Sequence, residues 1–154
     1  MFWDGYSSWV FRTFARGLFF QKIMNPQVYR AATDHVLVDD LLEQQRPKIF
    51  GYLESRIDGK FLVGSAFSLA DISIVSNLID YQYLGFAIDP NKYPKLSKYT
   101  ADILALEPVR EALERERPFA GQMGLDRSFL SSLCSRPTPS SASAPSTPRY
   151  CQVT

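Results

Sequence analysis

The residues that could do chemistry in this sequence are few and widely spaced. His35 is the only histidine, so the chain offers no histidine pair for a metal, and no G-x-S-x-G motif supports a serine triad built on it. Cys134 and Cys151 form neither a C-x-x-C motif nor a zinc cluster. We therefore expect His35 on a helix surface, and neither a catalytic residue nor a metal site in this chain.

Three charged residues, Asp71, Arg12 and Arg16, could each have either a functional or a structural role. Asp71 has the character of a partly buried catalytic carboxylate, but it stands three residues after Ser68, which is the spacing of a helix capping box. The structural role is favoured. Arg12 and Arg16 lie one helical turn apart and could meet an anion, although such arginines more often lay their stems over apolar neighbours.

Asp71 belongs to the stretch FSLADISIVSNLIDYQY, residues 67–83. Ser68 and Asp71 predict a capping box, and Phe67 and Ile72 stand at the two positions of a hydrophobic staple. Apolar or small residues follow on nearly every side, which is typical of a helix buried inside a domain. A buried strand is the alternative for a short apolar run. The cap, the length and a stop at Gly85 favour a central helix over about residues 68–84.

The remaining apolar pattern is helical as well. Residues 2–24 predict a first helix that ends at Asn25–Pro26. Residues 28–57 predict a longer one, and because the apolar face keeps its phase across Pro47, a bent helix is favoured over two separate helices. Residues 95–106 predict a further helix, and a last short one follows Glu107–Pro108.

These patterns predict an all-α fold with one domain and one tail. The domain spans residues 1–116. Residues 117–154 are expected to be an irregular to disordered tail, because their Ser/Pro-rich composition buries too little apolar surface.

The composition limits the cellular location and the binding partners that we expect for this chain. The chain has 154 residues, of which 45% are hydrophobic, and a net charge of +1. This balance gives no general attraction to nucleic acid or acidic membranes, and no apolar run reaches the roughly 20 residues of a membrane span. The start lacks the basic region of a signal peptide. We expect a cytoplasmic protein with no nucleic-acid or membrane partner.

Two stretches resemble a known family. GKFLVGSAFSLADISI, residues 59–74, resembles the C-terminal, all-helical domain of cytosolic glutathione transferases, where F-L-x-G, a short gap and S/T-x-A-D-I/L begin a buried helix. YPKLSKYTADILALEPVREALER, residues 93–115, resembles the YP-x-L-x-x-Y…P-x-V stretch of the last two helices of that family. The resemblance covers about residues 2–116 and implies a helical bundle around a buried central helix.

The resemblance also implies a function. In that family a thioredoxin-like N-terminal domain holds glutathione and helps its thiolate form, and no pattern of that domain is found here, since the helical pattern begins at residue 2. The expected function is that of the helical half of a glutathione transferase-like protein, which contributes the hydrophobic pocket for the electrophile and packs against the missing domain. Glutathione would be the co-substrate of the intact protein, while this chain alone is expected to bind no cofactor and to be inactive.

The candidate pocket residues follow from the same resemblance. The first helix of the family's helical half faces the thioredoxin-like domain, so Trp3, Tyr6, Val10 and Phe14 are candidates for the substrate pocket. A dense aromatic set is otherwise typical of a core. Without its partner domain this helix is expected to expose an apolar patch.

Alternatives stay open for the function and for the tail. The same fold also serves as a non-catalytic protein–protein interaction module, in translation-factor subunits, synthetase-complex scaffolds and stress regulators. A homodimer is a further expectation, because family dimers use both domains. A fragment, an altered reading frame near the end and a natural variant would each account for the tail.

Overall fold

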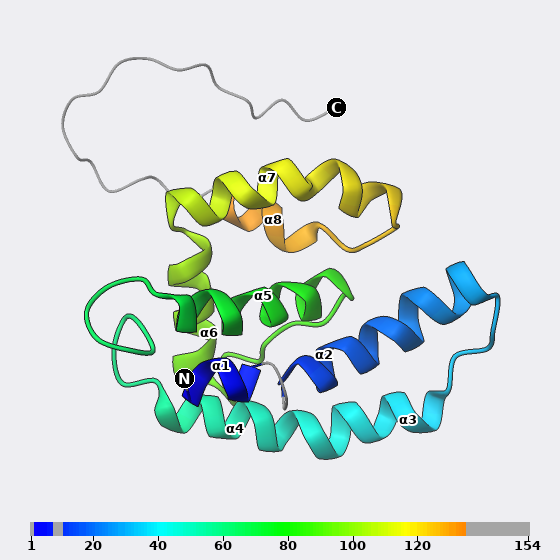
Figure 1. Ribbon diagram of the computed structural model, residues 1–154, viewed down its shortest axis with the longest axis horizontal. Coiled ribbons are helices and arrows are strands. Elements are labelled where there is room, and N and C mark those ends of the chain that lie inside the picture. The colour runs from blue at the N-terminus through cyan, green and yellow to red at the C-terminus, as the bar shows by residue number, and fades with distance from the viewer. Residues whose placement is uncertain (1, 8–10, 135–154) are drawn as a thin grey trace.

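The structure is a computed structural model that describes residues 2–7 and 11–134, and all regular secondary structure in these ranges is helical (Figure 1). The elements are α1 (Phe2–Tyr6), α2 (Arg12–Phe19), the π-helical η2 (Phe20–Tyr29), α3 (His35–Asp40), the π-helical η3 (Leu41–Gln45), α4 (Arg46–Arg56), α5 (Leu69–Tyr83), α6 (Pro94–Leu104), α7 (Glu107–Gln122) and α8 (Ser128–Cys134). The all-α prediction is confirmed. No helix of the described ranges combines the length and hydropathy needed to cross a bilayer.

Helix α5 is the centre of the bundle, as the sequence predicts. The helices α1, α2 and α6 all contact it, and Figure 1 shows it between the α2–α4 layer and the α7–α8 layer. Ile74, Leu78 and Tyr81 of α5 are fully buried. A helix with apolar residues on nearly every side is stable only in such a place.

Both ends of α5 form as predicted. The capping box at Ser68 and Asp71 is present, and the Asp71 carboxylate accepts the Ser68 N–H at 2.9 Å. At the other end Gly85 takes a left-handed φ of +84°, its N–H bonds to the Gln82 carbonyl, and the Phe86 N–H bonds to the Tyr81 carbonyl. This pair of bonds is a Schellman motif, and the Phe86 ring stacks on the Tyr81 ring at 5.0 Å.

The first helix differs from its prediction. Helices α1 and α2 flank residues 8–10, which lie outside the described part of the chain, so the difference is at the end, where the helical run continues through Asn25–Pro26 as far as Tyr29. In a π-helix the amide of residue 26 would bond to the carbonyl of residue 21, but Pro26 has no N–H. The Thr33 hydroxyl donates to the Gln21 carbonyl at 3.0 Å instead. The proline therefore leaves no orphaned carbonyl there.

The second predicted helix is a continuous run of α3, η3 and α4 over residues 35–56. It begins at Asp34, whose carboxylate accepts the Leu37 N–H at 3.0 Å, so the expected start near residue 28 is wrong. As predicted, the helical run continues through Pro47 and is not split into two helices. The π-helical turns of η3 lie just before Pro47, where the missing N–H makes regular α spacing unfavourable.

The predicted end of helical structure at residue 116 is wrong. Helix α7 continues through Arg117–Pro118 to Gln122, and α8 follows. Burial of Ala120 and Leu130 in the core stabilises this segment and offsets the hydrogen bond lost at Pro118. The expectation of an irregular tail is thus corrected for residues 117–134, and residues 135–154 lie outside the described part of the chain.

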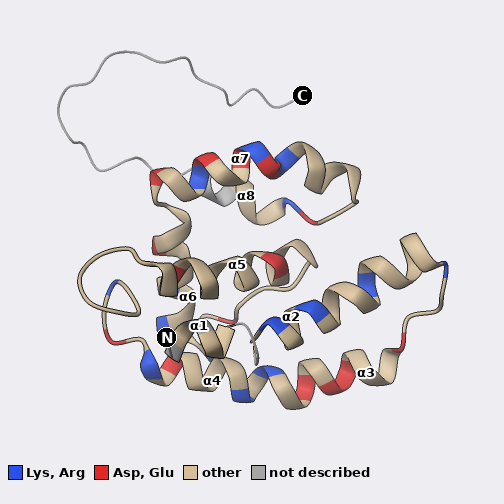
Figure 2. Ribbon diagram, viewed as in Figure 1, with Lys and Arg blue, Asp and Glu red and all other residues tan. Residues whose placement is uncertain are grey.

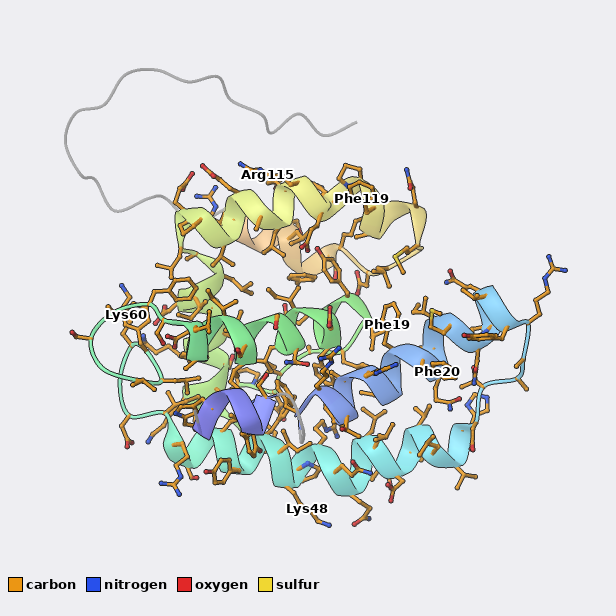
Figure 3. The ribbon with its side chains drawn as sticks, in the orientation of Figure 1. Phe19, Phe20, Lys48, Lys60, Arg115 and Phe119 are labelled. Carbon is orange, nitrogen blue, oxygen red and sulfur yellow. The ribbon has the colours of Figure 1, made fainter. Side chains whose placement is uncertain are left out.

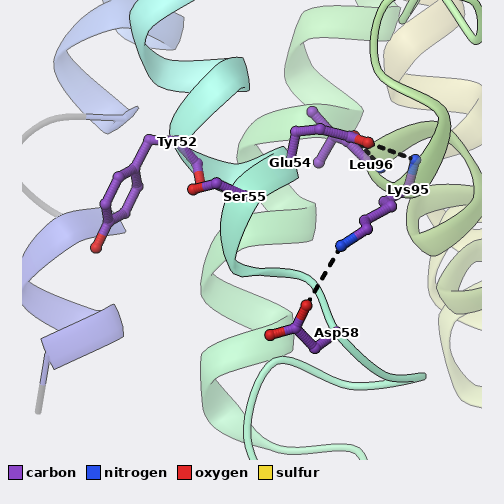
Figure 4. A network of polar contacts seen from close by, with 6 residues as sticks. All are labelled: Tyr52, Glu54, Ser55, Asp58, Lys95 and Leu96. Atoms are coloured by element: carbon purple, nitrogen blue, oxygen red, sulfur yellow. Dashed lines mark hydrogen bonds and ion pairs between the residues drawn. The ribbon is translucent and has the colours of Figure 1, made fainter.

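Helix α6 begins on a carboxylate that is distant in sequence (Figure 4). Glu54 of α4 accepts the N–H groups of Lys95 and Leu96 at 2.9 and 2.7 Å. The Lys95 ammonium also pairs with Asp58 at 3.3 Å. Because the N-terminal amides of a helix lack partners within it and carry a partial positive charge, Glu54 fixes α6 against α4.

Candidate functional site

A groove of about 470 Å³ lies between α2 and the central helix α5. The two helices run in the same direction, since Ser7 contacts the start of α5 and Lys22 donates to the Leu84 carbonyl at its end. The wall from the α1–α2 side and the wall from α5 both carry polar side chains. The lining residues are Ser7, Arg12, Arg16, Phe19, Ser73, Ser76, Asn77 and Asp80.

The α5 wall is built on one backbone oxygen. The Ser73 carbonyl accepts hydrogen bonds from the Ser7 hydroxyl at 2.7 Å, the Asn77 amide at 2.7 Å and the Ser76 hydroxyl at 3.2 Å. Asn77 also donates to the Ser7 hydroxyl at 3.1 Å. These bonds hold Ser7, after the end of α1, against α5. The Ser73 carbonyl is occupied by donors of the protein itself, so it is not available to a ligand.

Arg12 and Arg16 form the opposite, α2 wall. They are the only charged residues of α2, whereas cations and carboxylates alternate along α7 (Figure 2). The described ion pairs use Lys95, Lys98, Arg110, Arg115 and Arg117. Within the described ranges neither Arg12 nor Arg16 enters one of them.

Asp80 is the acidic residue of the groove. Partial desolvation of the carboxyl in the groove, and then the neighbouring Glu116 carboxylate of α7, raise the pKa of Asp80 from 3.8 to about 6, although the residue as a whole is exposed. Glu116 therefore places a second carboxylate near Asp80 in this groove. The charge of Asp80 changes close to physiological pH.

Two of the predicted pocket residues lie together at the start of the chain. The rings of Tyr6 and Tyr52 are 4.9 Å apart, and Trp3 meets Tyr6 edge-on at 6.2 Å. Trp3 and Tyr6 are half-buried. Burial and the adjacent Tyr52 raise the pKa of Tyr6 to about 12, so its phenol stays protonated at neutral pH. Tyr52 comes from α4, and no local pattern in the sequence predicts that it joins these rings.

The prediction for Phe14 is wrong, and Val10 lies outside the described residues. Phe14 is 0% exposed and packs against the rings of Phe11, Phe50 and Tyr81 at 5.9–6.2 Å. Phe11 is also 0% exposed. These two side chains belong to the core, so they contribute neither to a pocket nor to the exposed apolar patch expected on the first helix.

Asp71 has a structural place, in line with its prediction as a cap. It is 0% exposed and accepts four hydrogen bonds, from the Ser68 N–H, the Ser68 hydroxyl, the Leu62 N–H and the Tyr99 hydroxyl, at 2.8–2.9 Å. Burial, then the bond to Asp71, raise the pKa of the Tyr99 phenol. A carboxylate enclosed in this way cannot reach a substrate.

A second groove, of about 310 Å³ and apolar, separates α5 from α7. Phe67 and Ile72, the two expected staple residues, both line it. Its other wall includes Pro108, Val109 and Ala112 of α7, with Glu116 at one margin. On the outer side of α7, Arg115 and Phe119 point away from the body (Figure 3).

Metal chemistry has no evident location in the described residues. No cluster of three or more His, Cys, Asp or Glu side chains occurs there with a geometry that could hold an ion.

The fold and the capped central helix agree with a match to known sequences. The family model described as "Glutathione S-transferase, C-terminal domain" matches residues 19–116. The chain belongs to the glutathione S-transferase C-terminal domain family. A search of curated proteins and a search of solved structures each gave no match. Within this glutathione S-transferase domain the match includes α5, Ser68 and Asp71. It begins after Trp3, Tyr6, Arg12 and Arg16.

Proposed function

We propose that this glutathione S-transferase helical domain forms one wall of an electrophile pocket and packs against a thioredoxin-like domain that holds glutathione. The proposal rests on the groove between α2 and α5. Helix α5 is the central helix of the family fold. The half-buried pair Trp3 and Tyr6 adds aromatic surface on the helix that precedes α2, beside Tyr52 of α4. The intact protein would be a cytoplasmic homodimer, as the family resemblance implies.

In this proposal the chemistry is attack of the glutathione thiolate on an apolar electrophile. The thiolate would form in the thioredoxin-like domain, so no residue of this chain is assigned a catalytic role. The helical domain excludes water and holds the apolar part of the electrophile, which lowers the entropic cost of bringing the reactants together.

Binding of a product to the full chain tests the proposal. We expect S-dinitrophenyl glutathione to bind through its aromatic group, and glutathione alone to bind at least about tenfold more weakly, because burial of a ring is worth more than about 1.4 kcal/mol. The Trp3→Ala and Tyr6→Ala variants should lose this preference, while Phe119→Ala, on the outer side of α7, should keep it. Equal binding of the two ligands, or unchanged preference in the Trp3 and Tyr6 variants, would refute the pocket.

A second candidate is a non-catalytic interaction module, and the apolar groove between α5 and α7 favours it. Ile72 is 49% exposed beside this groove, which is unusual for the central helix of a bundle. The two functions use different faces. A charge at Ile72 or Val109 would disrupt a module that binds through the α5–α7 groove and leave product binding at the α2–α5 face intact.

A further inference from the structure

We propose that the α2–α5 groove binds an aromatic acid, with its acidic group on Arg12 and Arg16 and its ring against Phe19. The proposal rests on the function proposed above for this face and assigns it a substrate class, electrophiles that carry a carboxylate, sulfonate or phosphate. Arg12, Arg16 and Phe19 all line the groove. They are spaced i, i+4 and i+7 on α2 and so share one side of that helix.

The charge distribution around the two arginines points to an anion. Like charges one turn apart on a helix repel each other, and among the described residues no carboxylate pairs with either guanidinium. The cations of α7, in contrast, all pair with carboxylates of their own helix. Two neighbouring guanidinium groups present planar donors that match the oxygens of a carboxylate or phosphate.

The size and composition of the groove favour an acid with a ring over a small inorganic ion. A volume of about 470 Å³ lies in the range of sites for small organic molecules. Phe19 is partly buried and is the aromatic residue among the described residues that line the groove. On the wall opposite the arginines, the Ser73 carbonyl accepts three hydrogen bonds. These bonds reduce the repulsion between this oxygen and the acidic group of a ligand.

Asp80 sets a limit on the ligand. Its carboxylate lies in the same groove but forms no ion pair with Arg12 or Arg16, and its electrostatic neighbour is Glu116 of α7. It would repel a second acidic group placed beside it. The site therefore suits a ligand with one acidic group, at the arginine wall.

The test compares naphthoate with naphthamide, which has nearly the same shape and no charge, by isothermal titration of the full chain at low salt. We expect naphthoate to bind about tenfold more tightly, since a hydrogen bond to a charged group is worth about one factor of ten. In the Arg12→Gln/Arg16→Gln variant the two affinities should agree within about twofold. Inorganic phosphate, which has no ring, should compete at least about tenfold more weakly than naphthoate.

The matched control is Lys48→Gln/Arg115→Gln, which removes the same charge from two outward-facing residues and should retain the preference for naphthoate. Asp80→Asn should raise naphthoate affinity. Equal binding of acid and amide by the unsubstituted chain, a preference that survives in the double arginine variant, or phosphate binding as tight as naphthoate would each overturn the proposal. Loss of the Trp3 and Tyr6 dependence for S-dinitrophenyl glutathione would instead overturn the proposed pocket and leave the aromatic-acid site standing.

Discussion

Asp71→Ala is the substitution for which the structure predicts the largest loss of stability among the helix caps. Asp71 is 0% exposed and its carboxylate joins three separate segments, through Leu62, Ser68 and Tyr99. Truncation leaves the buried Tyr99 hydroxyl unpaired, which costs about 1–3 kcal/mol. The Leu62 and Ser68 amides are only partly buried and can reach water, so each adds about 0.5–1 kcal/mol. The sum is about 2–5 kcal/mol.

The measurement is urea unfolding followed by circular dichroism, with the free energy of unfolding obtained by linear extrapolation. Asp34→Ala is the matched control, because Asp34 caps α3 through an exposed bond to the Leu37 N–H and an exposed cap is worth about 1 kcal/mol. Asp71→Asn, which keeps one acceptor oxygen, should fall between the two.

A double-mutant cycle separates the Tyr99 bond from the cap. Tyr99→Phe removes the hydroxyl that Asp71→Ala would strand, so the combined loss should be smaller than the sum of the single losses by about 1–2 kcal/mol. Two results would refute the reasoning. One is an Asp71→Ala loss no greater than that of Asp34→Ala, and the other is strict additivity with Tyr99→Phe.

Three further predictions concern other sites. Asp80→Asn should raise the free energy of unfolding at pH 8, because the raised pKa of about 6 means that ionisation of Asp80 disfavours the folded state. A shift of about two pH units would be worth at most about 3 kcal/mol, and the exposure of Asp80 reduces this to about 1 kcal/mol. The gain should disappear below about pH 3, where Asp80 is protonated in both states, and urea unfolding at pH 8 and at about pH 3 checks it. Glu54→Gln should lower the free energy of unfolding by about 1 kcal/mol, since it removes the charge and one of the two acceptors at the start of α6, whereas Glu43→Gln on an exposed face should have no effect. The chain alone should not accelerate conjugation of glutathione to chloronitrobenzene, and turnover above the uncatalysed rate would show that it activates the thiol itself.

The sequence predicts best those features that depend on contacts between residues a few positions apart. The ends of α5 are an example, because Ser68, Asp71 and Gly85 act on backbone groups within one turn of themselves. The family motif around residues 59–74 is local in the same way. Arg12 and Arg16 were also recognised from their spacing, although only the structure shows that they face Ser73 and Asn77 of α5.

The errors concern contacts between distant segments. Apolar residues lie on two sides of the first helical segment, and its own pattern does not tell which side meets the core. Phe14 is buried because Phe50 and Tyr81 pack on it from α4 and α5. The bonds of Glu54 to the start of α6 span about 40 residues, and no local signal indicates them.

Prolines misled the prediction of helix ends for a related reason. Pro26 and Pro118 both lie inside helices. In the first case the Thr33 hydroxyl takes the place of the missing donor, and in the second the burial of Ala120 and Leu130 compensates. Both compensations come from residues beyond the proline, so the proline alone predicts a helix end.

The shared direction of α2 and α5 has a consequence for how the chain folds. Because the two helices run in parallel, the chain must return along the whole of α3–α4 before α5 can dock, and the bonds that join them span 62–70 residues. Contacts of such separation form late, since the entropy of closing the intervening loop opposes them. During synthesis Phe11, Phe14 and Leu18 therefore emerge well before the α5 side chains that bury them. Aggregation of nascent or truncated chains should begin at this aromatic segment, and it should stop once residues 69–83 are present to cover it.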